Sequence, residues 1–197
     1  MLRKIFIMAA GLTIATTAHA GDLKPIRIEA TNVAAPSTVT TKVPNVIHIH
    51  IGADFSMYER ARVLMAMNDW NFALNGTLRL QVVDDPAAAN DQAVWQVGMS
   101  RRKAPNPMVN RQLPIALTVP NTSGTGGILV FEAELAGRDL AAVMRHELGH
   151  LLGLEHMHSD GVMAVHYSPH SMKCIDRHSL KELAARRGLD PAALRGC

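Results

Sequence analysis

The feature that most constrains how this chain can fold is a set of histidines at fixed spacing in its C-terminal third. His146 and His150 are four residues apart, so on an α-helix their imidazoles lie on the same face and can bind one metal ion. The segment predicts a metal-binding helix from about Asp139 to Leu152. Apolar residues at helical spacing would anchor that helix against a core, and they are Leu140, Val143, Met144, Leu148, Leu151 and Leu152.

Three neighbouring residues indicate what kind of metal site this is. Glu147 follows the first ligand but is rotated off the ligand face, so it can act as a general base on a water molecule without binding the metal. Gly153 can adopt a left-handed conformation that ends the helix and turns the chain back. His156 then supplies a third nitrogen ligand, and its spacing from Gly153 favours it over the alternative, His158. Three protein ligands leave one position open, which is typical of a catalytic zinc site.

The N-terminal residues have the pattern of a secretory signal peptide. A basic start and a short apolar run are followed by an A-x-A cleavage site at Ala18–Ala20. We therefore expect residues 1–20 to be a signal peptide that directs the chain to the periplasm or the medium. Residues 21–45, rich in Thr, Pro and Ala, are expected to be a tether or a short pro-segment. Residues 46–197 are expected to form the catalytic domain.

Length and charge narrow the class of protein. The 197 residues suffice for one domain with a sizeable core. The chain has 20 basic and 17 acidic residues, and the signal peptide holds two of the basic ones, which leaves 18 against 17 and a net charge of +1. This near-neutral balance does not favour nucleic acid or a membrane as a partner.

Only two cysteines are present, Cys174 and Cys197. In an exported protein such a pair favours one disulfide, whereas two free thiols would suit a cytosolic protein. We expect the bond to hold a final helix that starts at Ser179, with Glu182 completing a capping box, and ends at Gly188.

The order of the predicted elements favours a mixed α/β fold. Alternating apolar residues predict a half-buried strand over Ile47–Ile51. Ser56 and Glu59 form a capping box that starts a helix, and Gly76 lies where that helix should stop. Strands followed by the metal-binding helix predict a sheet layer packed against helices. The further strands are expected at Leu78–Val82, Val94–Met99, Ile115–Val119 and Ile128–Phe131.

The extended histidine pattern resembles the metzincin clan of zinc peptidases. In that clan, His-Glu-x-x-His-x-x-Gly-x-x-His is followed by a Met-turn, for which Gly161-Val162-Met163 is the candidate here. Within the clan the chain is most similar to the matrixins, which have a Tyr four residues after that Met, where Tyr167 stands. Val165 replaces the usual Pro. The loop from Ser100 to Pro114 has no His or Asp, so a second, structural zinc is not expected.

The resemblance implies a metzincin-like zincin fold of the α/β (α+β) class, with a mixed twisted sheet, two long helices, a Met-turn and a C-terminal helix. It implies a secreted, monomeric zinc endopeptidase with one catalytic Zn²⁺ and a protein or peptide substrate. That substrate is expected to pair with an edge strand at Ile115–Val119. Met163 is expected to pack beneath the imidazoles without touching zinc. In the pocket after the cleaved bond, Tyr167 is expected to form a wall and Ala142 to set the depth.

Two other functions remain open on the sequence. A zinc hydrolase of cell-wall peptides would use the same site on a different substrate, because site chemistry does not fix the substrate. A non-catalytic zinc-binding module would need no base, whereas Glu147 is present.

Overall fold

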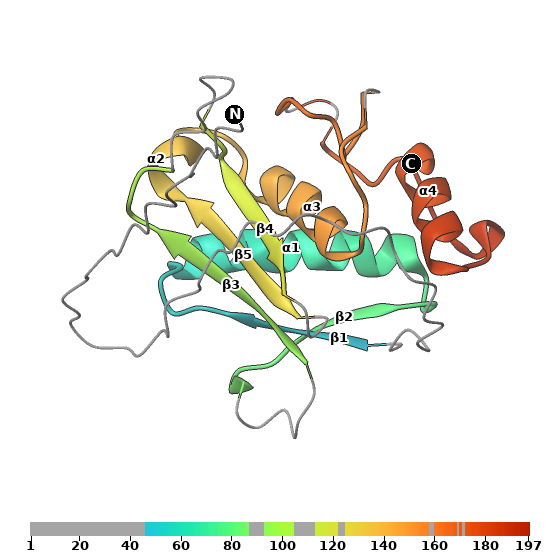
Figure 1. Cartoon of the computed structure of the whole chain (residues 1–197), viewed down its shortest axis with the longest axis horizontal. Helices are drawn as coiled ribbons and strands as arrows, with labels where there is room; N and C mark the ends of the chain where they lie inside the picture. Colours follow the sequence, from blue (N-terminus) through green and yellow to red (C-terminus); the bar gives the residue numbers. More distant parts are fainter. Residues whose placement is uncertain are drawn as a thin grey trace, which may run out of the picture. The chain divides into compact units, whose positions relative to one another are not determined.

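The structure of the chain is a computed structural model (Figure 1). It describes residues 46–86, 93–104, 113–121, 125–157, 160–168, 170 and 172–197. The expected signal peptide and the expected tether lie outside the described residues. In chain order the elements are β1 (Val46–Ile51), α1 (Met57–Leu74), β2 (Arg79–Val82), β3 (Val94–Ser100), β4 (Ala116–Pro120), β5 (Gly126–Phe131), α2 (Glu132–Leu135), α3 (Leu140–Leu151), α4 (Arg177–Arg187) and the 3₁₀-helix η2 (Pro191–Ala193).

The five strands form one mixed sheet in the order β2-β1-β3-β5-β4. β1 pairs in parallel with β2 and β3, β3 pairs in parallel with β5, and β4 alone runs antiparallel to its neighbour β5. In this register Ile49 of β1 lies between Val82 and Trp95. Among the described residues, the sheet therefore ends at β2 on one side and at β4 on the other. β4 overlaps Ile115–Val119, which the family resemblance implied as the edge strand for the substrate.

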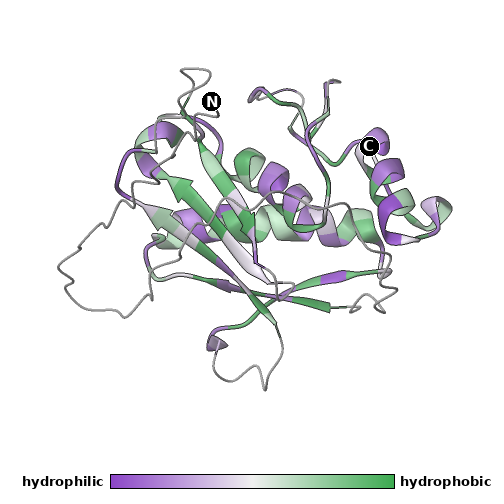
Figure 2. Ribbon diagram, in the orientation of Figure 1, coloured by the Kyte–Doolittle hydropathy of each residue, from purple (hydrophilic) through white to green (hydrophobic). Residues whose placement is uncertain are grey.

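One face of the sheet packs against the two long helices. Residues along β1 and β3 alternate between buried and half-buried, as expected for strands with one face turned into the core. Helices α1 and α3 contact each other, and α3 also contacts β4 (Figure 1). Figure 2 shows the mixture of hydrophobic and hydrophilic positions that this arrangement produces along strands and helices. None of the helices in the described part of the chain is long and apolar enough to cross a membrane.

Helix α1 begins and ends as its sequence predicts. The Ser56 side chain accepts a hydrogen bond from the Glu59 N–H, and the Glu59 carboxylate accepts one from the Ser56 N–H, which completes the capping box. The helix ends at Leu74, and its C-cap Asn75, in the left-handed region with φ 47°, comes one residue before the predicted stop at Gly76. Trp70 is fully buried, and its indole N–H donates to the carbonyl of Arg145 at 2.8 Å. This bond ties α1 to α3 next to the first histidine.

The C-terminal helix is capped differently from the prediction. We expected Ser179 and Glu182 to form a capping box, but the N-cap of α4 is Asp176, three residues earlier. The Asp176 carboxylate accepts from the N–H and the hydroxyl of Ser179, which places Ser179 inside the helix. An ionised carboxylate at a helix N-terminus is also favoured by the helix dipole. The helix ends at Gly188 as expected, with φ 62°.

The two cysteines form the predicted disulfide. Cys174 and Cys197 are bonded, with their Cα atoms 6.3 Å apart. The bond links the segment before α4 to the last residue of the chain, and the Cys197 N–H donates to the carbonyl of Ile175. The C-terminal end is thereby held against the start of α4.

Candidate metal centre and cleft

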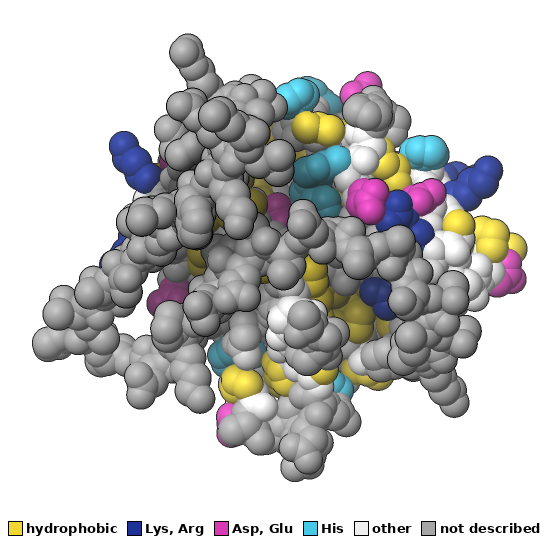
Figure 3. All heavy atoms as spheres, viewed as in Figure 1, with side chains coloured by type: hydrophobic (Ala, Val, Ile, Leu, Met, Phe, Trp, Pro, Cys, Tyr) yellow, Lys and Arg dark blue, Asp and Glu magenta, His cyan; other side chains and the backbone are white. Residues whose placement is uncertain are grey.

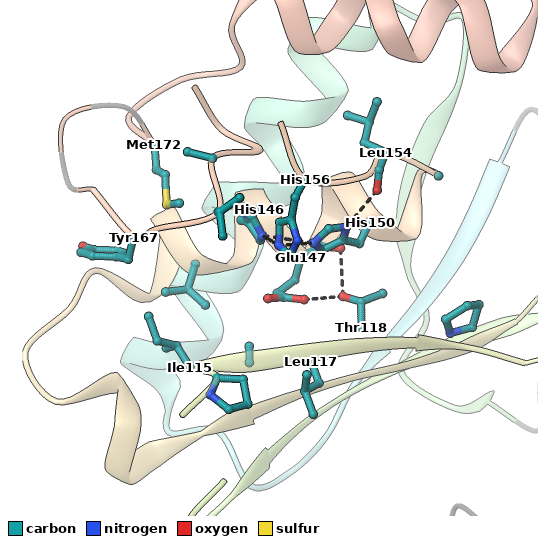
Figure 4. A pocket seen from close by; sticks show the side chains of 17 residues that line it. Ile115, Leu117, Thr118, His146, Glu147, His150, Leu154, His156, Tyr167 and Met172 are labelled. Carbon is teal, nitrogen blue, oxygen red and sulfur yellow. Dashed lines mark hydrogen bonds between the residues drawn. The ribbon is translucent and has the colours of Figure 1, made fainter. Parts of the chain in front are cut away.

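Helix α3 carries the first two histidines in a buried environment. Its N-cap is Asp139, whose side chain accepts from the Ala141 N–H. All but one residue of the helix are buried, including His146, which is 8% exposed. Because His146 and His150 are one turn apart, their rings project from the same side of α3, as Figure 4 shows. The core packing of α3 thus fixes the direction of both imidazoles.

A tight turn after α3 brings in the third histidine. Gly153 has φ 95°, a conformation that other residues rarely adopt, and the Leu154 N–H donates back to the carbonyl of Gly149. The chain reverses here, and His156 approaches the other two rings. The Nε2 atoms of the three histidines lie 3.1 Å, 3.1 Å and 3.3 Å from one another.

These nitrogens are arranged to bind a cation rather than to hydrogen-bond with each other. The Nδ1–H of His146 donates to the carbonyl of Val162, and that of His150 donates to the carbonyl of Leu154, both at 2.8 Å. In a neutral imidazole this leaves Nε2 with a lone pair and no proton, so the Nε2 atoms of His146 and His150 have no hydrogen to share. Nitrogens bound at about 2.0–2.1 Å to one tetrahedral zinc lie about 3.3–3.4 Å apart. The observed spacing fits that geometry.

Electrostatics keep the three rings neutral and available as ligands. Burial lowers the pKa of His146 to about 4, and the neighbouring His150 contributes further to this shift. Burial also lowers the pKa of His150 and of His156. A metal ligand must be unprotonated, so these side chains are ready to bind at neutral pH.

Glu147 lies beside the histidines but points away from their shared centre, towards β4 (Figure 4). It is 6% exposed. Burial raises the pKa of its carboxyl to about 7, although a hydrogen bond from Thr118 partly opposes this. That bond joins the Thr118 hydroxyl to the Glu147 Oε2 at 2.5 Å. A carboxyl with a pKa near neutrality can both accept and return a proton.

The histidines and Glu147 line a cleft of about 550 Å³ between α3, β4 and the segment after the Met-turn. On the β4 side the lining includes Ile115, Leu117 and Thr118, and on the other side it includes Tyr167 and Met172 (Figure 4). Histidine side chains reach the molecular surface among hydrophobic ones on the face in Figure 3. The arrangement is a buried carboxyl group beside three converging histidine nitrogens in a largely apolar cleft, as is usual for a substrate site.

Comparisons with known proteins identify the family. A family model described as matrixin matches residues 54–183. The chain belongs to the matrixin family. It is accordingly a zinc metallopeptidase of the metzincin type, as the sequence resemblance predicted. A search of curated proteins found no match.

The chain is also similar to solved structures, two of which are the following. One is archaemetzincin from Methanopyrus kandleri, with 14% identity and a TM-score of 0.48 over 75% of this chain and 98% of that one. Another is high choriolytic enzyme 1, a hatching enzyme zinc-protease from the medaka Oryzias latipes. It has 13% identity and a TM-score of 0.44 over 74% of this chain and 90% of that one.

The Met-turn of this matrixin packs directly under the metal-binding helix. Met163 is fully buried, and its side chain lies against Gly149 of α3 close to the Trp70 ring. The Met163 carbonyl accepts from the Met157 N–H, which closes the loop that carries His156. That Met163 does not touch the metal stays a prediction.

Three polar contacts that the sequence did not predict stabilise the Met-turn and the segment that follows it along the cleft. The Asp176 carboxylate accepts from the Val162 N–H at 2.9 Å, next to the carbonyl that orients His146. The buried Arg145 guanidinium donates to the carbonyl of Met172 at 2.9 Å and pairs with Asp69 of α1 at 2.6 Å. In the matrixin cleft these bonds fix both the Met-turn and Met172. No local pattern marks them, because each joins residues far apart in the sequence.

The expected pocket residues are placed as follows. Tyr167 lines the cleft, and its hydroxyl accepts from the Asp139 N–H at 3.0 Å. Ala142 is 2% exposed and is not among the residues that line the cleft, whereas its neighbour Val143 is. The role of Ala142 in pocket depth stays a prediction, and the structure adds Val143 as a residue that faces the cleft. His158, the alternative ligand, lies outside the described residues.

Proposed function

We propose that this matrixin is a secreted endopeptidase that cleaves proteins within an extended segment, with Glu147 as its general base. The observation that carries the proposal is the position of Glu147. Its carboxylate is buried in the cleft, adjacent to His146 in the sequence and off the centre on which the three histidines converge. A site that only stores or displays zinc needs no such group.

The residues of the cleft support a hydrolytic mechanism. His146, His150 and His156 would hold the zinc, and the ion would supply the Lewis acidity that lowers the pKa of a water molecule to about 7 and polarises a peptide carbonyl. Glu147 accepts the proton of that water as its oxygen bonds to the carbonyl carbon. Glu147 then returns the proton to the amine nitrogen as the C–N bond breaks, so the reaction leaves the carboxylate as it began.

The edge of the sheet supports an extended substrate. In the described part of the chain, β4 has a sheet neighbour on one side only, and its residues line the cleft beside Glu147. An extended peptide can add to such an edge by main-chain hydrogen bonds. This favours cleavage within a polypeptide over removal of a terminal residue.

The pocket beside the site supports apolar specificity. Tyr167, Met172 and Val143 line it, and each methylene that a substrate buries there contributes about 0.8 kcal/mol. We expect cleavage before Leu, Met or Phe. Export to the periplasm or the medium is proposed on the signal-peptide pattern of residues 1–20.

The test uses protein expressed from the full sequence and loaded with zinc. It is incubated with casein, a peptide library and cell-wall fragments, with and without a chelator. We expect casein and library peptides to be cut in the zinc-loaded sample only. Glu147→Ala should abolish the cleavage while zinc measured by mass spectrometry stays bound, and His150→Ala should lose the zinc. Hydrolysis of cell-wall fragments alone would instead support the cell-wall enzyme, and zinc binding without any hydrolysis would support the non-catalytic module.

A further inference from the structure

Thr118 connects the free edge of the sheet to Glu147. It lies in the middle of β4, opposite Ile128 of β5, and its side chain crosses the cleft towards α3 (Figure 4). The hydroxyl lies 2.5 Å from Oε2 of Glu147 and 3.1 Å from the main-chain carbonyl oxygen of the same residue. A single residue of the strand thus contacts both the side chain and the backbone of Glu147.

The Thr118 hydroxyl contacts one oxygen of the Glu147 carboxylate and leaves the other oxygen available. A hydroxyl has one proton to donate, and the shorter distance assigns it mainly to Oε2. With Oε2 held, the carboxylate cannot rotate freely about its terminal bond, a torsion that is otherwise broad. Oε1 is then the oxygen left to exchange a proton with the reacting groups.

The position of Thr118 also couples substrate binding to this orientation. A peptide that pairs with β4 adds hydrogen bonds to a strand that pairs, among the residues the structure describes, only with β5. Such pairing restrains the strand that holds the carboxylate. If peptide binding at β4 aligns the Glu147 carboxylate, the binding energy speeds the chemical step. It then raises kcat rather than lowering KM.

We propose that Thr118 is a positioning residue that fixes the Glu147 carboxylate for proton transfer and makes its alignment depend on peptide binding at β4. The inference rests on the proposed peptidase function. It assigns to Thr118 a part in the reaction that a purely structural contact between β4 and α3 would not have. Loss of a purely structural contact would affect folding and metal content, whereas loss of a positioning residue affects kcat.

Two variants separate these roles. Thr118→Val keeps the size and branching of the side chain and removes the hydroxyl, and Thr118→Ser keeps the hydroxyl and removes the methyl group. The matched control is Thr77→Val, because the Thr77 hydroxyl also donates to a helix carbonyl, that of Leu74 at 2.6 Å, but Thr77 does not line the cleft. All variants are made in the full chain and loaded with zinc, and their zinc content is measured by mass spectrometry.

We expect Thr118→Val to bind zinc normally and to lose about ten- to a hundredfold in kcat with little change in KM, which is the usual effect of losing a hydrogen bond to a charged group. Thr118→Ser should recover most of the loss, and Thr77→Val should match the wild type. Lengthening a peptide along β4 should raise kcat in the wild type but lower only KM in Thr118→Val.

Several results would overturn the proposal. They are an unchanged kcat in Thr118→Val, a loss that appears only in KM or in zinc content, or no recovery in Thr118→Ser. A crystal structure of metal-free Thr118→Val gives a readout without activity: we expect Glu147 to leave its wild-type rotamer, and an unmoved carboxylate would contradict the inference. If the zinc-loaded wild type cuts no peptide, the proposed function fails, and this structural measurement still decides the contact.

Discussion

Gly149 allows the Met-turn to pack against the metal-binding helix, so replacing it with alanine tests that packing. It lies in α3 one residue before His150. A Cβ built on Gly149 would overlap the sulfur of Met163 and lie 3.1 Å from its methyl carbon and 3.4 Å from the Trp70 ring. Met163 and Trp70 are both fully buried, so neither can move into solvent to make room.

Two effects of Gly149→Ala oppose each other. Alanine in the interior of a helix is favoured over glycine by about 1 kcal/mol. An extra carbon in a well-packed core costs typically 1–3 kcal/mol, and the sulfur contact places this site at the upper end. We therefore expect the metal-free protein to lose about 1–2 kcal/mol. Displacement of α3 should also weaken zinc binding, because the His146 ring donates to Val162 of the same Met-turn.

Urea unfolding of the metal-free protein and competition with a zinc chelator measure the two effects. Gly98→Ala is the matched control, because a Cβ there meets only the Leu129 side chain at 3.9 Å. In a double-mutant cycle, Met163→Ala should remove most of the penalty of Gly149→Ala, with a coupling energy of about 1–2 kcal/mol. If Gly149→Ala were more stable than the wild type and bound zinc equally well, the packing argument would be refuted.

The remaining predictions concern the C-terminal segment and the pocket. Burial alone would raise the pKa of Asp176, but hydrogen bonds to its carboxylate outweigh this and hold the pKa below its ordinary value. The stabilisation is therefore present above about pH 4 and is lost as the pH falls through the lowered pKa. Asp176→Asn should cost about 1–2 kcal/mol at pH 7 in urea unfolding, and the gap to the wild type should close at lower pH. Serine at both Cys174 and Cys197 should cost roughly 3 kcal/mol in the same assay; an unchanged midpoint would contradict this. In peptide-library profiling, Val143→Ala should favour larger residues after the cut, and Ala142→Val should favour smaller ones if Ala142 sets the pocket depth.

Much of the fold and the convergence of the three histidines could be predicted from local patterns. One helix and one turn bring His146, His150 and His156 together, so their convergence can be predicted without knowledge of the rest of the chain. The capping box at Ser56 and Glu59 and the alternation in β1 are likewise properties of neighbouring residues. Their physical determinants lie within a few positions of each other, which is the range over which sequence patterns are informative.

What sequence could not supply depends on tertiary contacts. Asp176 and Ser179 are both good N-cap residues, and the local pattern favoured Ser179 because Glu182 completes a capping box. Asp176 is the cap because its carboxylate also reaches the Val162 N–H, fourteen positions away in the chain. Thr118 was expected only as part of an edge strand. Its contact with Glu147 spans 29 positions, and no periodicity reports such a distance.

The groups that orient the ligands link zinc affinity to the folding of the C-terminal segment. The carbonyl of Val162 holds the His146 ring, and the N–H of the same residue is held by Asp176. Hydrogen bonds to the second ring nitrogen fix the tautomer that binds metal, and losing them typically costs 10- to 100-fold in affinity. Because linkage is reciprocal, zinc binding must stabilise this segment by the same free energy by which the segment improves zinc binding. Asp176→Asn should therefore weaken zinc affinity although Asp176 contacts none of the three histidines, and zinc should raise the unfolding midpoint of the variant less than that of the wild type. Equal zinc affinity in the two proteins would show that the Val162 carbonyl is held without Asp176.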